Sequence, residues 1–350
     1  MSADAEALRT DPAAWDAFVE AAPNGAYPQL SAWAEVKRPN GWRATRVAAA
    51  VEGVTVGMQL LVRDLRPLPW RIGYAPRGPV ADGLAPAAIA ALTGELRAVA
   101  RAQRIAEVLV DPEVEPDHPL IGALEAAGWR AGRGIQTERT RLVDLDRPEE
   151  EVWGDLRSKW RQYVNKARRD GVTIEDGGAG GLDEFYRIYV DTARRAGFIH
   201  RARRAYDDVF HAFEAGGRAR LLMARLADGT PCATLMLLHC GRRVIEPYGG
   251  MTEAGASSRA NYLLKWEAIR SSRERGFTVY DMWGLSHPGI EHFKAGFGGR
   301  EVTYAGGRAL VLDPFGSGLV GVARRINVAL ARRRHGLAGG EAAGQGTDAT

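Results

Sequence analysis

Cysteine is scarce in this chain, and both cysteines lie in apolar, strand-like sequence. Cys232 and Cys240 are the only two among 350 residues, and their spacing is not that of a CxxC metal or redox pair. We therefore expect two reduced thiols in a core, as in a protein of a reducing compartment. Long apolar runs are also missing, since no stretch reaches the roughly 18 residues that a membrane span requires. The N-terminus carries acids instead of an apolar signal core, so we expect a soluble, cytoplasmic protein.

The motifs of several large enzyme classes are absent as well. The chain contains no HExxH, CxxC, GxSxG or Walker loop, and no GxGxxG follows a predicted strand. The R/Q-x-x-G-x-G/A loop, with which acetyl-coenzyme A enzymes bind a pyrophosphate on backbone N–H groups, is missing too. Residues 130–134 (RAGRG) come nearest to it, in the wrong register. These absences argue against metallopeptidase, serine hydrolase, nucleotide triphosphatase and coenzyme A chemistry.

The excess of positive charge is small but unevenly placed. Lys and Arg number 47 against 43 Asp and Glu, a formal net charge of +4, which alone does not indicate nucleic-acid binding. Basic residues concentrate in 156–172 (LRSKWRQYVNKARRDGV), where apolar residues at spacings of three and four predict one buried helix face. Such a helix can be an inter-domain helix with a solvated face, or it can contact phosphates. A second basic helix, expected at 316–334, would suit an anionic membrane or tRNA equally.

The order of the predicted elements indicates an α/β (α+β) protein in which one acetyltransferase-like fold is used twice. Helices, antiparallel hairpins, a helix and a strand occur in 1–145 and again in 150–312. The main expected elements are a helix at 7–21 capped by Thr10 or Asp11, a Glu52-Gly53 hairpin, a helix at 86–103, a strand at 138–144 that completes the first unit, helices at 149–170 and 259–275, and strand-like sequence at 301–312.

The richest candidate for chemistry lies near the C-terminus. A strand is expected to end at Tyr280-Asp281, and a Gly-rich loop then presents Phe293, Lys294 and Phe297. Ligand clefts commonly open where strands end. A lysine between aromatic residues in such a loop suits a charge held near a ligand, although a plain turn with a surface lysine fits the same pattern.

Two other stretches carry polar groups in suggestive places. The loop at 74–82 (YAPRGPVAD) is made rigid by prolines, and its Arg77 could point at a ligand anion as well as end a strand. Asn261 and Tyr262 begin the predicted helix 259–275 and are its polar groups most suited to face a cleft.

Taken together, these stretches resemble the Fem family of peptidoglycan-bridge aminoacyltransferases. The resemblance runs from about residue 27 to residue 315, and a set of stretches in the same order carries it: 31–37 (SAWAEVK), 74–82, 109–112 (LVDP), 156–172, 248–251 (YGGM), 261–269 (NYLLKWEAI), 280–285 (YDMWGL) and 293–299 (FKAGFGG). The long coiled-coil insertion of some members is missing from 182–230, so the chain is similar to the compact, arm-less branch.

The resemblance implies two tandem GNAT-like domains and a specific reaction. The first domain would span 1–147 and be completed by a C-terminal helix at 313–335, the second would span 148–312, and 336–350 would be a disordered tail. The reaction would move Gly, Ala or Ser from aminoacyl-tRNA to an amine of lipid II or of UDP-MurNAc-pentapeptide. Because the donor ester is already activated, no cofactor and no metal would be required. Peripheral contact with the inner membrane surface would accompany a lipid-linked acceptor.

Residue roles follow from the matching motifs. Lys37 resembles the lysine, and Arg201 the arginine, that hold the phosphates of the precursor, with Tyr206 near the family's substrate tyrosine and Tyr248 at the position of a cleft tyrosine. The residues after Lys37 are Arg38 and Pro39 where some members carry an aromatic residue, and a single Tyr206 stands where some have a pair. These departures concern the identity of the acceptor.

Two further residues match positions tied to the chemistry. Lys294, after Phe293, resembles the lysine at the reaction centre near the tRNA end, and Asp111 matches an acid once considered as the base. A lone carboxylate before a proline is more often a structural group, so Asp111 is the weaker of the two candidates.

Three other interpretations remain open at this stage. Arm-less relatives also extend peptidyl antibiotics with aminoacyl-tRNA, which keeps the reaction and changes the acceptor. An acyl-coenzyme A N-acyltransferase has the same fold, although its pyrophosphate loop is missing here. A non-catalytic module that holds precursors or RNA is the third, against which the intact 280–285 and 293–299 stretches argue.

Overall fold

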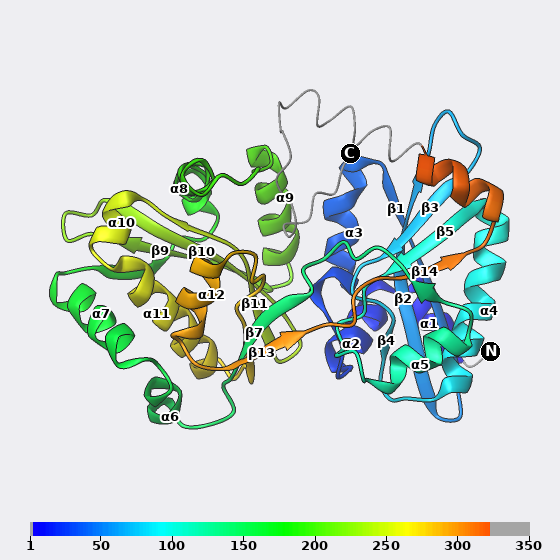
Figure 1. Ribbon diagram of the computed structural model, residues 1–350, viewed down its shortest axis with the longest axis horizontal. Coiled ribbons are helices and arrows are strands. Elements are labelled where there is room, and N and C mark those ends of the chain that lie inside the picture. The colour runs from blue at the N-terminus through cyan, green and yellow to red at the C-terminus, as the bar shows by residue number, and fades with distance from the viewer. Residues whose placement is uncertain (1–2, 323–350) are drawn as a thin grey trace. The chain divides into compact units, whose positions relative to one another are not determined.

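The computed structural model describes residues 3–322 and divides the chain into two compact units (Figure 1). The first unit comprises the residues up to Glu138 together with those from Thr303 onward, and the second comprises Arg139–Val302. The second unit is therefore an insertion in the first.

The first unit contains a mixed sheet in the order β1-β2-β3-β5-β14-β6, with β4 paired to β2. The strands are β1 (Trp42–Val51), β2 (Val54–Asp64), β3 (Arg71–Ala75), β4 (Val80–Ala81), β5 (Ile105–Val110), β6 (Arg130–Ala131) and β14 (Arg308–Val311). The expected hairpin is confirmed, because Val51 pairs with Val54 and both Glu52 and Gly53 have positive φ. β3 and β5 run parallel, which requires the crossover that the next helix supplies.

Helices cover both faces of this sheet. They are α1 (Ala3–Thr10), α2 (Pro12–Ala21), α3 (Ser31–Lys37), α4 (Pro86–Gln103) and α5 (Pro119–Ala126). Apolar residues of α4 and α5 join alternate residues of β2, such as Met58 and Leu60, in one core. Gly57 points to the other face, where a Cβ would clash with Trp15 of α2. The predicted cap is confirmed, since the Asp11 carboxylate accepts the Ala13 N–H at 2.8 Å.

The second unit contains a seven-stranded sheet in the order β13-β7-β12-β11-β10-β9-β8. The strands are β7 (Arg139–Asp144), β8 (Thr173–Asp176), β9 (Ala219–Arg225), β10 (Pro231–Cys240), β11 (Arg243–Met251), β12 (Val279–Asp281) and β13 (Arg300–Thr303). The helices are α6 (Glu149–Gly154), α7 (Ser158–Arg169), α8 (Leu182–Ala196), α9 (Arg203–Glu214), α10 (Glu253–Ser257), α11 (Ala260–Glu274) and α12 (Pro288–Ala295). Leu235 and Leu237 of β10 share a core with α7 and α11. Cys232 and Cys240 are buried free thiols, as expected.

The two units repeat one topology, which confirms the predicted fold class. In the first, a run of antiparallel strands ends in β3, and α4 leads to the parallel β5. In the second, the antiparallel run ends in β11, and α11 leads to the parallel β12. In the first unit α1, α2 and α3 precede the antiparallel strands, and in the second α8 and α9 precede β9–β11; a short helix, α5 or α12, follows the parallel strand. This is the acetyltransferase-like arrangement used twice.

The unit boundaries differ from the expected ones because two strands were assigned to the wrong sheet. The strand over 138–144 was expected to complete the first unit, but β7 pairs with β12 in the second sheet. The strand-like sequence at 301–312 is divided, since β13 belongs to the second sheet and β14 pairs with β5 in the first. Strand pairing is set by long-range contacts, which local sequence patterns do not report.

Two predicted helices also differ in detail. The single helix expected at 149–170 is two helices, α6 and α7, with an extended residue, Arg157, before α7. Helical residues 314–322 follow β14, and there Trp70 of the first unit donates to Asp313 at 2.7 Å and packs against Phe315. The rest of the basic helix and the tail from 336 onward lie outside the described residues. Within residues 3–322, no helix combines the length and apolar character that crossing a membrane would require.

Candidate functional site

The residues singled out from the sequence fall into both units. Lys37, Arg77 and Asp111 lie in the first unit. The second unit holds the remainder, which are Arg201, Tyr206, Tyr248, Asn261, Tyr262, Phe293 and Lys294. Their surroundings differ greatly, so each group is described within its own unit.

Lys294 and Phe293 are carried by a helix, which corrects the expectation of a Gly-rich loop. The helix α12 starts at Pro288, where a proline's missing N–H costs nothing, and His287 caps it by accepting the Gly289 N–H at 3.1 Å. It ends at Gly296. Phe297, expected to be presented by that loop, is fully buried. Glycines at both ends of a short helix resemble a glycine-rich loop in sequence, and this explains the error.

The ammonium of Lys294 is held by three backbone carbonyls. Its Nζ donates to Met282 O at 2.6 Å, to Gly284 O at 2.8 Å and to Trp283 O. An ammonium has three donors, so all of them are used. Desolvation of the ammonium among protein groups lowers the pKa of Lys294 to about 8, against an opposing effect of Glu246.

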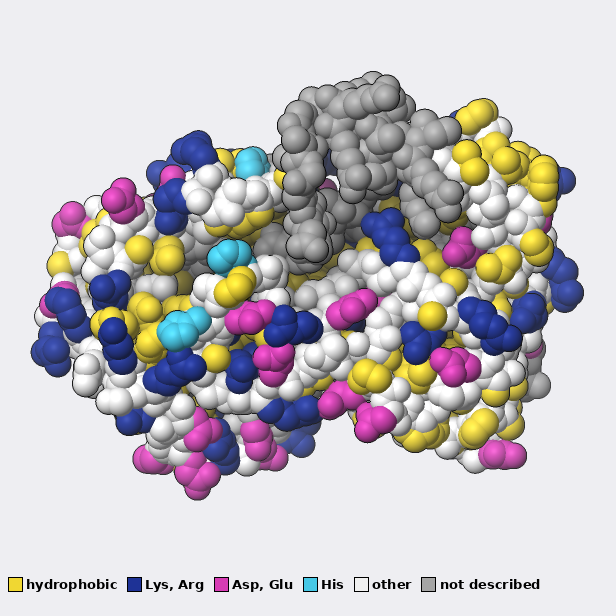
Figure 2. All heavy atoms as spheres, viewed as in Figure 1, with side chains coloured by type: hydrophobic (Ala, Val, Ile, Leu, Met, Phe, Trp, Pro, Cys, Tyr) yellow, Lys and Arg dark blue, Asp and Glu magenta, His cyan; other side chains and the backbone are white. Residues whose placement is uncertain are grey.

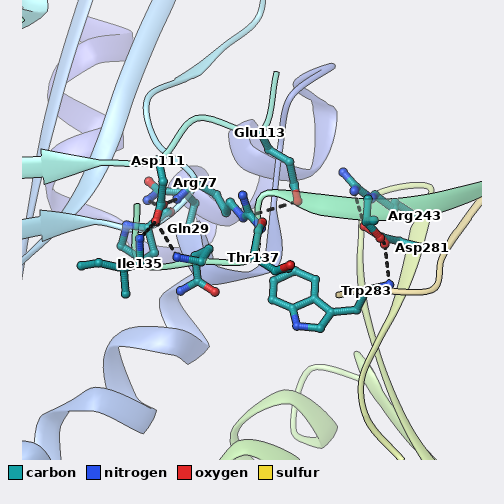
Figure 3. Close-up of polar contacts among 12 residues, drawn as sticks. Gln29, Arg77, Asp111, Glu113, Ile135, Thr137, Arg243, Asp281 and Trp283 are labelled. Carbon is teal, nitrogen blue, oxygen red and sulfur yellow. Dashed lines mark hydrogen bonds and ion pairs between the residues drawn. The ribbon is translucent and has the colours of Figure 1, made fainter. Parts of the chain in front are cut away.

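The segment 282–284 that binds Lys294 is also held from its other side. Asp281 is fully buried, and its carboxylate accepts the Trp283 N–H at 2.7 Å and the Thr140 hydroxyl, and pairs with Arg243 (Figure 3). Trp283 has φ of +51°, a conformation that costs energy in a residue with a side chain. Hydrogen bonds from Lys294 and to Asp281 thus hold the turn at 282–284 in this strained conformation. Strained backbone of this kind is common at functional sites.

A β-bulge places a second buried ion pair close to Lys294. Met236 pairs with Tyr248 and Leu238 with Ile245, so Glu246 and Pro247 of β11 oppose the single residue between them on β10. The carboxylate of Glu246 pairs with Lys265 of α11 and accepts the Tyr280 hydroxyl at 2.6 Å. The side chains of Glu246 and Lys265 are 3 % and 4 % exposed. Burial, and then the Glu246 carboxylate, raises the pKa of Tyr280 well above its ordinary value, so this phenol stays protonated.

The charges of this region leave Lys294 without a carboxylate partner. Glu246 is paired with Lys265, and Asp281 with Arg243. The partners of Lys294 among the described residues are carbonyl dipoles, not carboxylates. A partly buried cation balanced only by dipoles favours the approach of an anion or of an oxygen that gains negative charge. In the described part of the chain, no group of three or more His, Cys, Asp or Glu side chains is placed to hold a metal.

Aromatic rings of α7 and α11 pack against Phe293, the neighbour of Lys294 on α12. The ring centroid of Tyr262 lies 5.1 Å from that of Phe293 and 5.3 Å from that of Trp160. Burial raises the pKa of Tyr262. The side-chain oxygen of Asn261 is buried and has no hydrogen-bond partner among the described residues. The structure therefore brings Asn261, Tyr262, Phe293 and Lys294 together around α11 and α12, as their sequence neighbourhoods suggested.

Tyr206 and Tyr248 belong to a second aromatic cluster, between β11, α8 and α9. Their ring centroids are 5.1 Å apart, and Tyr189 of α8 contacts both. The Tyr206 hydroxyl accepts the backbone N–H of Arg201 at 3.0 Å. Burial raises the pKa of Tyr189 and of Tyr206, and the nearby Arg201 opposes it only partly. Tyr206 is only 3 % exposed, so its main contribution is to pack inside this aromatic cluster.

In the first unit, Asp111 organises two loops. Its carboxylate accepts the Tyr74 hydroxyl at 2.8 Å and the backbone N–H groups of Arg77 at 2.9 Å, Gln136 at 3.0 Å and Ile135 at 3.3 Å (Figure 3). Three of these donors bind Oδ2 and one binds Oδ1, so most of the acceptor capacity of the carboxylate is used. Proton abstraction by Asp111 would require breaking this set, so its contacts favour a structural role over that of a general base.

Arg77 and Lys37 are also buried within the first unit. Arg77 is 1 % exposed, donates to Thr137 O at 2.8 Å, pairs with Glu113 at 3.5 Å and lies over the Tyr304 ring. These contacts direct its guanidinium into the fold instead of toward a ligand. Lys37 is 4 % exposed, and its ammonium lies 4.7 Å from the ring centroid of Trp33.

Several residues of this geometry were not singled out from the sequence. Glu246, Lys265, Arg243 and Thr140 hold the surroundings of Lys294, and Tyr189 completes the tyrosine cluster. Two signals were available in the sequence. A proline at 247 inside a predicted strand indicates a bulge, and a lysine at 265 between Leu264 and Trp266 lies on the apolar face of its helix.

Gly296 gives a direct test of the packing of α12 against α7. A Cβ at this position would lie 2.2 Å from two atoms of the Trp160 indole, although φ is −72° and the backbone itself would accept alanine. We expect Gly296→Ala to lower the free energy of unfolding by about 1–3 kcal/mol through overpacking. Gly289→Ala on the same helix is the control, because its nearest neighbour is 3.4 Å away and belongs to the His287 ring. Equal stability of the two variants in urea denaturation would contradict the packing described here.

The lowered pKa of Lys294 predicts a pH dependence of stability. Between about 8, the folded value, and about 10.4, the unfolded value, the unfolded chain binds more protons than the folded one. The free energy of unfolding contributed by Lys294 therefore rises with pH across this window, by on the order of 2 kcal/mol. We expect wild type to gain this amount relative to Lys294→Met between pH 7 and pH 10. The exposed Lys166→Met is the control and should show no such gain; a Lys294→Met difference that is flat with pH would refute the shift.

Comparison with known proteins agrees with this fold. The acetyltransferase (GNAT) domain family matches residues 154–295, and the FemAB family matches residues 10–119. The lipid II:glycine glycyltransferase of Staphylococcus haemolyticus (strain JCSC1435) is 32 % identical over 222 residues, which cover 60 % of this chain and 53 % of that protein. The enzyme of the same name from Staphylococcus aureus is 30 % identical over the same extent. The chain thus spans about half the length of the curated relatives that it matches.

Solved structures extend the likeness to nearly the whole chain. The crystal structure of FemX superposes with a TM-score of 0.81 at 23 % identity and covers 86 % of this chain and 96 % of that one. A tandem GNAT protein from the clavulanic acid biosynthesis pathway has a TM-score of 0.50 at 12 % identity, over 78 % and 84 % of the two chains. Two family matches in separate units and curated relatives at 30–32 % identity, on a shared tandem fold, support membership of the Fem (FemAB) family.

Proposed function

We propose that this protein is an aminoacyltransferase that moves an amino acid of the Gly, Ala or Ser class from aminoacyl-tRNA to an amine of a peptidoglycan precursor. Family membership and relatives that carry the name lipid II:glycine glycyltransferase support this proposal. The observation that carries it is the ammonium of Lys294, a cation without a carboxylate partner that the fold fixes beside an aromatic surface.

The reaction needs what this geometry provides. The amine nitrogen of the acceptor forms a bond to the ester carbonyl carbon, and the bond from that carbon to the ribose oxygen breaks. The nitrogen loses one proton and the ribose oxygen gains one. Negative charge develops on the carbonyl oxygen between these events, and a fixed cation in a partly dry site stabilises it. Because its three donors are bound to residues 282–284, Lys294 acts through its field and through the turn that it orders.

The phosphates of a lipid-linked or nucleotide-linked acceptor would meet basic residues. We propose Lys37 and Arg201 for this role and Tyr206, Tyr248 and Asn261 for the walls of the acceptor site. Arg201 supports this assignment best, because it lies close to Tyr189 and Tyr206 and its main chain is anchored to the Tyr206 hydroxyl. A lipid-linked acceptor also implies that the protein works in the cytoplasm at the inner membrane surface.

A transfer assay tests the proposal. Purified protein is incubated with tRNA charged with labelled Gly, Ala or Ser and with lipid II, UDP-MurNAc-pentapeptide or a phosphate-free peptide of the same sequence. We expect label to appear in a phosphate-bearing acceptor and not in the free peptide. Label in the free peptide alone would favour extension of a peptidyl antibiotic instead.

An acyl-coenzyme A reaction is the other candidate that this fold allows. In the second unit, the connection between β11 and α11 holds the short helix α10 and Arg259 in a left-handed conformation, not a glycine-rich pyrophosphate loop. We therefore expect no coenzyme A binding in calorimetry. Consumption of an acyl thioester, with no transfer from any charged tRNA, would replace the proposed function by this one.

A further inference from the structure

The basic helix α7 carries a surface in which cations cover aromatic rings. The Arg259 guanidinium lies 4.7 Å and the Lys159 ammonium 5.7 Å from the ring centroid of Tyr163. The Arg157 guanidinium lies 5.6 Å from the ring centroid of Trp160 and within 3.4 Å of the His292 ring nitrogens. We call Arg157, Lys159, Tyr163, Arg259 and His292 the α7 face. Figure 2 shows Lys and Arg side chains gathered around apolar ones over this helix.

The cations of the α7 face have no carboxylate partners. Among the described residues, Arg157, Lys159 and Arg259 form no ion pair with Asp or Glu. Elsewhere on the same helix, Lys166 pairs with Asp170 at 2.6 Å and Arg168 pairs with Glu267 at 2.6 Å. Lys166 and Arg168, near the C-terminal end of α7, thus have acidic partners, whereas the cations of the α7 face have none among the described residues. Unpaired cations on a surface otherwise rich in ion pairs indicate an external anion.

The α7 face adjoins the surroundings of Lys294 through α12. The Trp160 ring packs against His292 with centroids 5.4 Å apart, and the Trp160 indole N–H donates to Phe293 O at 3.0 Å. Phe293 immediately precedes Lys294. A ligand that lies along the α7 face therefore has one end at the cation that the proposed reaction uses.

We propose that the α7 face binds the single-stranded 3′ end of the donor RNA, and this inference rests on the proposed function. Backbone phosphates would replace the missing acidic partners of Arg157, Lys159 and Arg259. Unstacked bases would stack on the outer plane of the Arg259 guanidinium and on the Tyr163 ring, as in sequence-tolerant recognition of single strands. A membrane surface fits less well, because the described residues of this face include no exposed large apolar side chain that could enter a bilayer.

The test compares two RNA minihelices, one with a single-stranded 3′ ACCA tail and one blunt. We expect wild type to bind the tailed form about tenfold more tightly, the range of a stacked base. The triple variant Arg157→Gln, Lys159→Gln, Arg259→Gln should lose this preference, and its log Kd should depend less steeply on log salt, by about two. Tyr163→Leu, with the charges intact, should lose the tail preference and retain the salt slope.

A charge-matched control removes the same three charges from other positions of the helix. The variant Lys166→Gln, Arg168→Gln, Arg169→Gln should keep the preference for the tail. The inference is overturned if both triple variants keep the preference for the tail, or if both lose it equally. It is also overturned if wild type shows no preference for the tail and the α7 face instead mediates binding to phosphatidylglycerol vesicles. The wild-type transfer assay distinguishes failure of this inference from failure of the proposed function. If wild type transfers the amino acid but the α7 face does not affect RNA binding, only this inference is refuted. If wild type binds the tail but transfers no amino acid, the proposed function is refuted.

Discussion

Replacement of Lys294 by methionine is expected to lower kcat/KM for aminoacyl transfer by about 10²–10³, the effect of removing one stabilising group from an oxyanion site. The loss has two parts. The fixed positive charge disappears, and the carbonyls of Met282, Trp283 and Gly284 are left without their common donor. Single-turnover transfer from labelled aminoacyl-tRNA is the suitable measurement, because it reports the chemical step without product release.

Two additional variants separate lost charge from a disturbed turn. Lys294→Ala leaves room for a small cation, so added propylammonium should restore part of the activity if charge is what the site needs. The neutral isostere propanol should restore none. The basic limb of the wild-type pH–rate profile should fall near the Lys294 pKa of about 8, since only the ammonium carries the charge. A Lys294→Met protein that retains the wild-type rate within a factor of about three would remove Lys294 from the mechanism.

Local structure was predictable wherever neighbouring residues determine it. The cap at Asp11, the Glu52-Gly53 turn and the helix α4 all follow from short-range hydrogen bonds and side-chain periodicity. The repeat of one element order was visible for the same reason. What failed was the assignment of β7 and β14 to sheets, because two strands of similar composition can pair with many partners and only the complete chain selects among them.

The candidate site was predicted in part, and there are physical reasons why some of its residues were found from the sequence and others were not. Motifs located Lys294 and its aromatic neighbours, since these lie together on α11 and α12. They did not reveal that Arg77 and Asp111 bind groups of their own unit, because a charged side chain in a loop has the same sequence pattern whether it faces solvent, ligand or core. The environment of Lys294 was missed because it depends on the bulge at Glu246, which only the pairing of β10 with β11 creates.

The buried pair of Glu246 and Lys265 carries the largest predicted effect on stability. Replacement of Lys265 by methionine leaves the Glu246 carboxylate, 3 % exposed, with the Tyr280 hydroxyl as its remaining partner among the described residues. We expect a loss of about 3–5 kcal/mol in the free energy of unfolding, most of it the cost of an uncompensated buried charge. The exposed pair of Lys166 and Asp170 is the control, and Lys166→Gln should cost less than about 1 kcal/mol.

The double variant Glu246→Leu, Lys265→Met distinguishes a desolvated charge from a lost contact. If the single-variant cost comes from the orphaned carboxylate, removal of both charges should recover most of it, so the coupling energy in the double-mutant cycle should exceed about 2 kcal/mol. The same double variant should still alter the transfer reaction, because Glu246 raises and Lys265 lowers the pKa of Lys294, and loss of the larger of these effects, that of Glu246, shifts the basic limb to lower pH. A protein restored in stability, yet shifted in the basic limb of its pH–rate profile, would show that this pair is retained for the field it creates at Lys294. Additive losses in urea denaturation, with an unchanged pH–rate profile, would instead make it an ordinary packing contact.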